Sequence, residues 1–170
     1  MPYKFLSILA AVALVAACET APMEDSSSSG SGASSASSGS SVSSAAIVPG
    51  SQQDLVVNVG DRVFFEFDKF DLSAEARTTL EKQAAWLQTH RGVTVTVEGH
   101  ADERGTREYN IGLGERRANS AKDYLVALGV NPDRITTVSY GEERPVAVGS
   151  NETAWAQNRR AVTVVTGAGS

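Results

Sequence analysis

Residues 93–128, VTVTVEGHADERGTREYNIGLGERRANSAKDYLVAL, carry the clearest transition from strand to helix in this chain. Valine alternates with threonine or glutamate over residues 93–98, which predicts a strand with one apolar face. A polar stretch bounded by glycines, residues 99–105, predicts a loop. Thr106 is then expected to cap a helix that runs to Leu128 and ends at the following glycine. This stretch therefore predicts one strand–loop–helix unit of an α/β fold.

Apolar periodicity and capping residues predict further elements on both sides of this unit. The expected strands are 55–59, 62–67, 135–140 and 161–166, and the expected helical segments are 74–89, 131–132 and 152–158. Strands that alternate with helices pair in parallel, and the last segments can add antiparallel neighbours. We therefore expect an α/β (α+β) fold, a two-layer sandwich whose mixed β-sheet carries both long helices on one face.

Composition limits the function classes that need consideration. The chain has 170 residues with 15 Lys and Arg against 20 Asp and Glu, a net charge of −5, which argues against nucleic acid as the main partner. One cysteine excludes an intrachain disulfide framework and a multi-cysteine zinc site. No serine lies in a G-x-S-x-G elbow, and no H-E-x-x-H sequence is present. We therefore expect no enzymatic activity, no catalytic residue, no metal and no cofactor.

The N-terminal residues have the features of a bacterial export signal. Lys4 precedes Phe5–Ala17, an apolar run of 13 residues that is too short to span a bilayer. Small residues then precede Cys18, as in a lipobox, where cleavage before the cysteine and acylation of its thiol create a lipid anchor. We expect residues 1–17 to be a signal peptide and Cys18 to be lipidated; an ordinary secretory signal with a chance cysteine is the alternative. Glu19, in place of an aspartate, favours the outer membrane.

A serine-rich stretch separates this signal from the α/β pattern. Serine accounts for 13 of the 19 residues from Ser26 to Ser44. Such a composition buries too little apolar surface to offset the entropy of ordering. We expect residues 18–50 to be a lipid-bearing, disordered tether and residues 51–170 to be a folded domain in the periplasm.

Asp102 and Arg117 are candidate binding residues. Asp102 lies in the loop after the central strand, and Asn110, Leu113 and Arg117 share one face of the following helix. If they are held apart across a cleft, the two charges suit a zwitterion, with Asp102 taking an ammonium and Arg117 a carboxylate. If they meet directly, they form a salt bridge of structural value only. Either residue is expected to be replaceable by alanine without loss of the fold.

Five strings of this sequence follow one another in the order found in a known family. They are FEFD at 65–68, GHADERG at 99–105, YNIGLGERRAN at 109–119, VSYG at 138–141 and QNRRA at 157–161. In these strings the chain resembles the OmpA-like peptidoglycan-binding domain, over about residues 63–166. The resemblance implies an OmpA-like β-α-β-α-β-β order of elements.

The resemblance also implies a ligand, a site and partners. The implied ligand is meso-diaminopimelate in the peptide stem of peptidoglycan, bound without a covalent bond, and the family's hallmark residues fall on Asp102 and Arg117. In relatives the site is also lined by the residues at Phe67, Asp68, Arg104 and Leu113. Further implied partners are the periplasmic proteins TolB and TolA, with the outer membrane held through the lipid on Cys18. The alternative is a periplasmic protein-interaction module that does not bind the cell wall.

Other polar residues in these strings have structural interpretations. Arg107 stands where many relatives have proline, which predicts a small cost in stability and an intact site. His100 is expected to be a hydrogen-bonded residue at the strand end, with a role as a base as the alternative. Asn158 and Arg159 are expected to close a turn and to pair with an acid, while Arg160 either stabilises the fold or contributes to the site.

Overall fold

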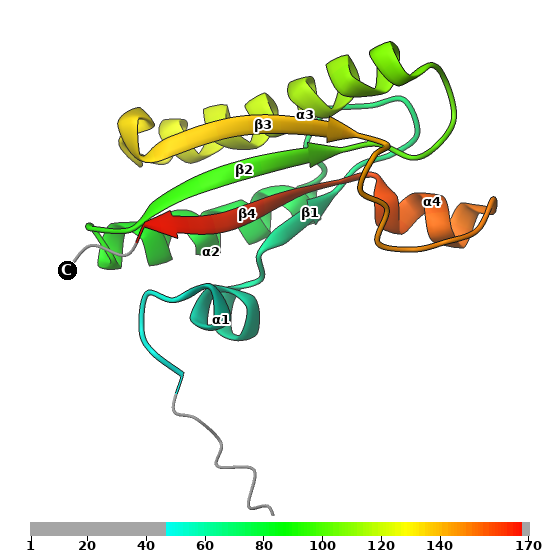
Figure 1. Cartoon of the computed structure of the whole chain (residues 1–170). Helices are drawn as coiled ribbons and strands as arrows, with labels where there is room; N and C mark the ends of the chain where they lie inside the picture. Colours follow the sequence, from blue (N-terminus) through cyan, green and yellow to red (C-terminus); the bar gives the residue numbers. More distant parts are fainter. Residues whose placement is uncertain (1–46, 168–170) are drawn as a thin grey trace, which may run out of the picture. The chain divides into compact units, whose positions relative to one another are not determined.

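A four-stranded mixed sheet forms the framework of the protein, in the order β1-β4-β2-β3 (Figure 1). The computed structural model describes residues 47–167. The strands are β1 (Arg62–Phe64), β2 (Thr94–His100), β3 (Ile135–Gly141) and β4 (Arg160–Gly167). The helical segments are α1 (Gln52–Asp54), the π-helical turn η1 (Leu55–Val59), α2 (Ala74–Thr89), α3 (Arg107–Ala127), the 3-10 turn η2 (Pro132–Arg134) and α4 (Glu152–Asn158). Within residues 47–167, none of the helices has the length and apolar character needed to cross a membrane.

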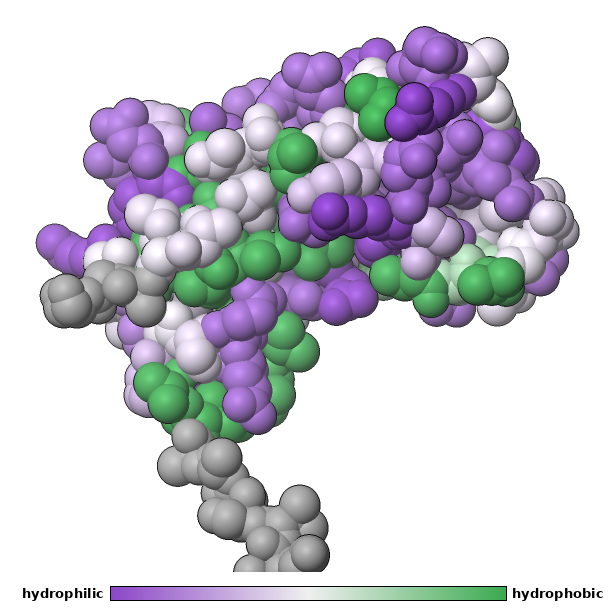
Figure 2. Space-filling view, in the orientation of Figure 1, coloured by the Kyte–Doolittle hydropathy of each residue, from purple (hydrophilic) through white to green (hydrophobic). Residues whose placement is uncertain are grey.

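The two long helices cover the same face of the sheet. Strand β2 is parallel to β3 and antiparallel to β4, and β1 pairs with β4 in the antiparallel sense. From β2, the buried Val95 and Val97 join the core that α2 and α3 complete. On the opposite face, Figure 2 shows apolar residues over the sheet and hydrophilic residues around the loops that follow β2 and β3. The predicted two-layer fold, with a mixed sheet and both long helices on one face, is confirmed.

Residues 55–59 are helical, so the strand predicted there is wrong. The carboxylate of Asp54, at the junction of α1 and η1, organises this segment. It accepts hydrogen bonds from Gly50 N (2.8 Å), Asn58 Nδ2 (2.7 Å) and Trp86 Nε1 (2.9 Å). These bonds close a helical turn and bring Leu55 fully into the core. Tertiary contacts therefore outweigh the β preference of the valines in this stretch.

Strand β1 ends at Phe64, three residues earlier than predicted. Phe65 N still donates to Arg159 O (2.9 Å), after which the chain turns away from the sheet. Asp68 then adopts a left-handed backbone conformation, with φ of 56°, which is uncommon for a residue other than glycine. The residues between Phe65 and Asp68 thus become a loop beside the ends of β2 and β4.

Helix α3 lies close to the end of β2 because two glycines meet there. A Cβ built on Gly99 would lie 1.8 Å from the carbonyl oxygen of Gly114, and one built on Gly114 would lie 2.9 Å from the carbonyl oxygen of Gly99. In the same region Ser139 Oγ, from β3, donates to Ile111 O at 2.6 Å. This contact holds the first half of α3 against the sheet and so sets its position relative to the loop after β2.

Candidate binding site

A cavity of about 190 Å³ lies where the loop after β1, the loop after β2 and helix α3 meet. All six residues predicted to line a site are in its wall: Phe67, Asp68, Asp102, Arg104, Leu113 and Arg117. The wall is completed by Tyr109 and Asn110 of α3 and by small residues of the loop after β2. The sequence strings at 65–68, 99–105 and 109–119 are therefore brought together at one place.

Asp102 is a buried carboxylate whose oxygens are fully occupied. Its Oδ1 accepts hydrogen bonds from Arg104 N (3.1 Å) and Arg104 Nε (3.0 Å). Its Oδ2 accepts from Arg104 Nη2 (2.7 Å) and Arg159 Nη1 (3.3 Å). Burial alone would raise the pKa of Asp102, but the hydrogen bonds and charges of these arginines outweigh it and lower the pKa. The group is therefore an anion at neutral pH.

Arg117 is fully buried, and its guanidinium donates to three backbone carbonyls. Nε donates to Lys69 O (2.8 Å), Nη1 to His100 O (2.8 Å) and Nη2 to Glu66 O (3.1 Å). Burial lowers the pKa of Arg117 to about 10, so the side chain remains a cation at neutral pH. A guanidinium has five N–H groups, so these three bonds leave two unused, and Arg117 lines the cavity.

Asp102 and Arg117 face one cavity without forming the direct salt bridge that was the structural alternative. Asp102 takes its ion pairs from Arg104 and Arg159, and Arg117 donates to carbonyls. The carbonyl bonds also mean that Arg117 joins the loop after β1 to the end of β2. Its replacement by alanine would leave three acceptors without their donor, so the expectation that the fold tolerates this change does not agree with the contacts.

The Arg104 guanidinium lies between two aromatic rings, a feature that the sequence did not indicate. Its central carbon is 4.0 Å from the ring centre of Phe67 and 4.1 Å from that of Trp155, on α4. The indole of Trp155 covers Arg104 and donates from Nε1 to Glu103 Oε1 at 3.0 Å. Nothing in the spacing of the strings placed α4 beside the loop after β2.

Two residues of α3 fix the part of the cavity wall that this helix forms. Tyr109 Oη donates to the carboxylate of Asp68, which joins α3 to the left-handed residue of the loop after β1. Asn110 Nδ2 donates to Asp102 O at 3.2 Å and also to Glu142. Asn110 was placed by its spacing on the same helix face as Leu113 and Arg117, and the structure puts all three in the cavity wall.

Most of the polar residues for which we expect a structural role have such a role in the structure. Arg159 pairs with Asp102 and with Glu152, and the Asn158 side chain bonds to the backbone of residues 146–147, as predicted. Arg160 donates to carbonyls of residues 144 and 158, and it does not line this cavity. The prediction for His100 is wrong in one respect: among residues 47–167, neither ring nitrogen has a hydrogen-bond partner.

The predicted signal peptide, Cys18 and most of the predicted tether lie outside the described residues, as does the end of the predicted domain at 168–170. The structure describes residues 47–50 of the tether segment, of which Gly50 already contacts the fold through Asp54.

Comparison with known proteins identifies the family to which this chain belongs. The model of the OmpA family matches residues 64–159, so the chain belongs to the OmpA family. Over 126 residues, 74% of this chain and 75% of the relative, it is 57% identical to the peptidoglycan-associated lipoprotein of Brucella melitensis. It is 40% identical over 157 residues to that of Pseudomonas aeruginosa, covering 92% of this chain and 93% of the relative.

A solved structure supports the same assignment. The crystal structure of the peptidoglycan-associated lipoprotein from Burkholderia pseudomallei is similar with a TM-score of 0.61 and 40% sequence identity. The match covers 62% of this chain and 90% of that chain. The resemblance first seen in the five sequence strings is therefore confirmed at the level of sequence and of fold.

Proposed function

We propose that this protein binds peptidoglycan without a covalent bond, at the meso-diaminopimelate of the peptide stem, and holds the outer membrane to the cell wall. One observation carries the proposal: a small cavity contains a buried anion, Asp102, and a buried cation, Arg117, that are not paired with each other. Diaminopimelate presents an ammonium and a carboxylate on one carbon. The names of the relatives point to the same polymer.

Each wall of the cavity has a part in this binding mode. The two free N–H groups of Arg117 are suited to the ligand carboxylate, and Asp102 is suited to its ammonium. Leu113 offers an apolar surface to the methylene chain, while Phe67 and Asp68 offer backbone groups at the start of the loop. Arg104 completes the polar wall. Charge-assisted hydrogen bonds contribute about 1.5–3 kcal/mol each, and part of this is lost to ordering the ligand.

Modest affinity for one stem peptide is sufficient for such a tether. The polymer carries many copies of the ligand, and lipid-anchored domains form an array that faces it, so avidity strengthens the attachment. The lipid on Cys18 and the serine-rich tether supply the membrane end of the proposal. By resemblance to the family, TolB and TolA are proposed as periplasmic partners in envelope integrity and cell division.

Co-sedimentation with isolated cell-wall sacculi tests the proposal. The full chain, purified in detergent, is compared with Asp102→Asn and with Glu115→Gln, which also removes one negative charge but lies exposed on α3. We expect the wild type and Glu115→Gln to sediment with sacculi and Asp102→Asn to remain in solution. Arg117→Lys is preferred to alanine because it keeps a charge among the three carbonyls, and thermal unfolding of each variant shows whether the fold persists.

Failure of the folded wild-type chain to sediment with sacculi would reject cell-wall binding. That outcome would favour the periplasmic protein-interaction module, for which capture of periplasmic proteins is the next experiment. Sedimentation of Asp102→Asn at the wild-type level would remove Asp102 from the site while leaving cell-wall binding in place.

A further inference from the structure

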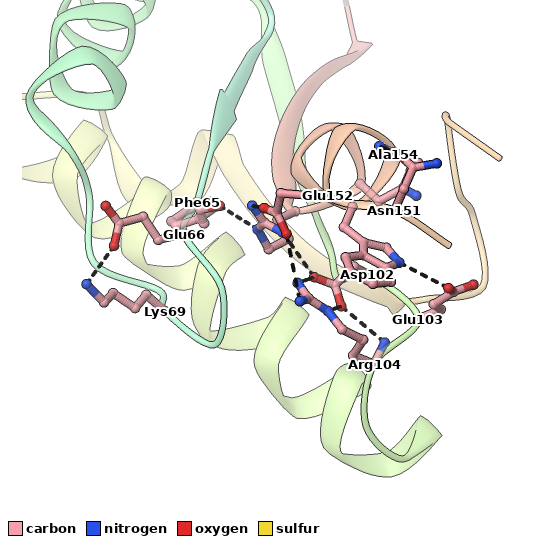
Figure 3. Close-up of polar contacts among 12 residues, drawn as sticks. Phe65, Glu66, Lys69, Asp102, Glu103, Arg104, Asn151, Glu152 and Ala154 are labelled. Atoms are coloured by element: carbon pink, nitrogen blue, oxygen red, sulfur yellow. Dashed lines mark hydrogen bonds and ion pairs between the residues drawn. The ribbon is translucent and has the colours of Figure 1, made fainter. Parts of the chain in front are cut away.

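Four charged side chains form a closed ring beside the cavity (Figure 3). Asp102 pairs with Arg104 (2.7 Å) and Arg159 (3.3 Å), and Glu152 pairs with Arg159 (2.6 Å) and approaches Arg104 (3.8 Å). The signs alternate around the ring, so each cation has two carboxylates and each carboxylate has two cations. Glu152 is not in the cavity wall.

The ring leaves no free acceptor on Asp102. Four N–H groups already occupy its two oxygens, three from Arg104 and one from Arg159. A carboxylate offers about four lone-pair positions, so an incoming ammonium needs one of these donors to leave. The free protein therefore holds an internal cation at the position that an amine ligand must take.

Arg104 is the cation that can leave. The side chain of Arg159 is 7% exposed and is also held by Phe65 O at 3.0 Å and by Glu152 at 2.6 Å, so it cannot turn away from Asp102 without breaking these bonds in a buried place. The side chain of Arg104 is 29% exposed, and its contacts apart from Asp102 are the faces of two aromatic rings and the more distant Glu152. An aromatic face holds a guanidinium without fixing its direction as a carboxylate does.

Glu152 is placed to receive Arg104. It occupies the first turn of α4, three residues before Trp155, so the carboxylate and the indole lie on neighbouring positions of one helix face. Its side chain is 64% exposed and already 3.8 Å from Arg104 Nη1. A small rotation of the guanidinium between the rings of Phe67 and Trp155 exchanges one carboxylate for the other and keeps both ring contacts.

We propose that Glu152 is a positioning residue for ligand binding, which takes over Arg104 when the ammonium of an amino-acid ligand displaces it from Asp102. The inference rests on the proposed function. A ligand shifts such an equilibrium only by its preference for one state over the other, so a second carboxylate for Arg104 lowers the cost of vacating Asp102. Glu152 then strengthens binding without touching the ligand.

A double-mutant cycle measured by isothermal titration tests this role, with a soluble muropeptide that contains meso-diaminopimelate as the probe. The full chain in detergent is compared with Glu152→Gln, Arg104→Gln and the double variant, and Glu115→Gln serves as the charge-matched control. We expect Glu152→Gln to weaken binding about three- to fivefold, the range of a partly exposed ion pair. In the Arg104→Gln background the same change is expected to have no effect, because Arg104 is no longer there to need a new partner and Arg159 keeps Asp102 and Phe65 O.

Each result separates this inference from the function beneath it. If the wild type does not bind the muropeptide, the proposed function fails first. If the wild type binds and Glu152→Gln binds equally well or better, the positioning role is rejected alone. A loss that persists in the Arg104→Gln background would reject the role through Arg104 and show that Glu152 acts through its other partner, Arg159. Complete loss of binding in Arg104→Gln would show that Arg104 does not act as a displaceable cation. Thermal unfolding confirms that each variant is folded.

Discussion

The imidazole of His100 is enclosed at the end of β2 in surroundings that favour its neutral form. Burial lowers the pKa of His100 to about 4, and the nearby positive charges of Arg160 and Arg144 act in the same direction. Glu98 Oε2, 3.7 Å from Nε2, is the one acid found near the ring among residues 47–167, and it does not outweigh them. Tyr140 stacks on the ring with centroids 5.6 Å apart. With a pKa so far below 7, the imidazole accepts a proton poorly at neutral pH, which supports a structural role for His100.

This burial predicts a loss of stability as the pH falls from 7 to 5. In the unfolded chain the pKa of His100 returns to about 6.5. The unfolded state therefore binds more protons in this range, and protonation favours unfolding. The expected loss for the wild type is about 1–2 kcal/mol of unfolding free energy, measured by chemical denaturation at each pH. His100→Phe keeps a stacking ring and removes the titration, so its stability is expected to change less. If the unfolding free energy of His100→Phe falls with pH as steeply as that of the wild type, the effect belongs to another group.

At the residue scale, the sequence predicted which side chains line the cavity but not how they are used in the free protein. The helix spacing of Asn110, Leu113 and Arg117 could be read directly, because a regular helix fixes which side chains share a face. The bonds of Arg117 to three carbonyls could not be predicted from the sequence, since they depend on the path of the loop after β1. The partner of Asp102 across the fold, Arg159, is 57 residues away and belongs to another element.

At the scale of elements, the contact of α3 with β2 decides where the cavity forms. The helix approaches until the backbone of Gly114 meets that of Gly99, and no side chain fits between them. A Cβ on Gly114 would also lie 2.3 Å from Ser139 Oγ, which holds Ile111 O. Substitution here must push α3 away from the sheet or displace the serine, and both changes disturb the same contact.

Two glycines on this one helix allow a matched test. Gly114→Ala is expected to lower the unfolding free energy by about 1–3 kcal/mol, the usual cost of overpacking. Gly112→Ala places its Cβ 3.6 Å from the flexible end of Arg116, so it is expected to be neutral or to add up to about 1 kcal/mol through helix propensity. Guanidinium chloride denaturation measures both. Equal stability of the two variants would contradict the proposed role of the Gly99–Gly114 contact.

Elements with strong periodic patterns were predicted well, and segments whose structure depends on distant partners were not. The strand at 93–98 and the helix from Thr106 to Leu128 agree with β2 and α3 to within one or two residues. The segment 55–59 has the valines of a strand, but Asp54 and the distant Trp86 hold it in a helical turn. A pattern within five residues carries no information about such a partner.

At the scale of the whole molecule, the proposed function requires two attachments, and each can be removed by a substitution that leaves the other in place. In the proposal, the cavity of the folded domain is the attachment to the wall, and Cys18, outside the described residues, is the attachment to the membrane. Several acyl chains bind a bilayer durably because each buried CH₂ contributes about 0.8 kcal/mol. Serine has the size of cysteine and a hydroxyl where the thiol would carry the lipid, so Cys18→Ser is expected to remove the proposed anchor.

Cys18→Ser is therefore expected to move the protein from the outer-membrane fraction to the soluble periplasmic fraction while leaving binding to isolated sacculi unchanged. Asp102→Asn is expected to stay in the outer-membrane fraction and to lose binding to isolated sacculi, because it alters the cavity and leaves the cysteine in place. Fractionation of cells and sedimentation with sacculi, carried out on both variants, measure the two attachments separately. Persistence of Cys18→Ser in the outer-membrane fraction of cells would mean that the domain is held there by something other than its own lipid. Loss of sacculus binding in Cys18→Ser would mean that the two attachments are coupled.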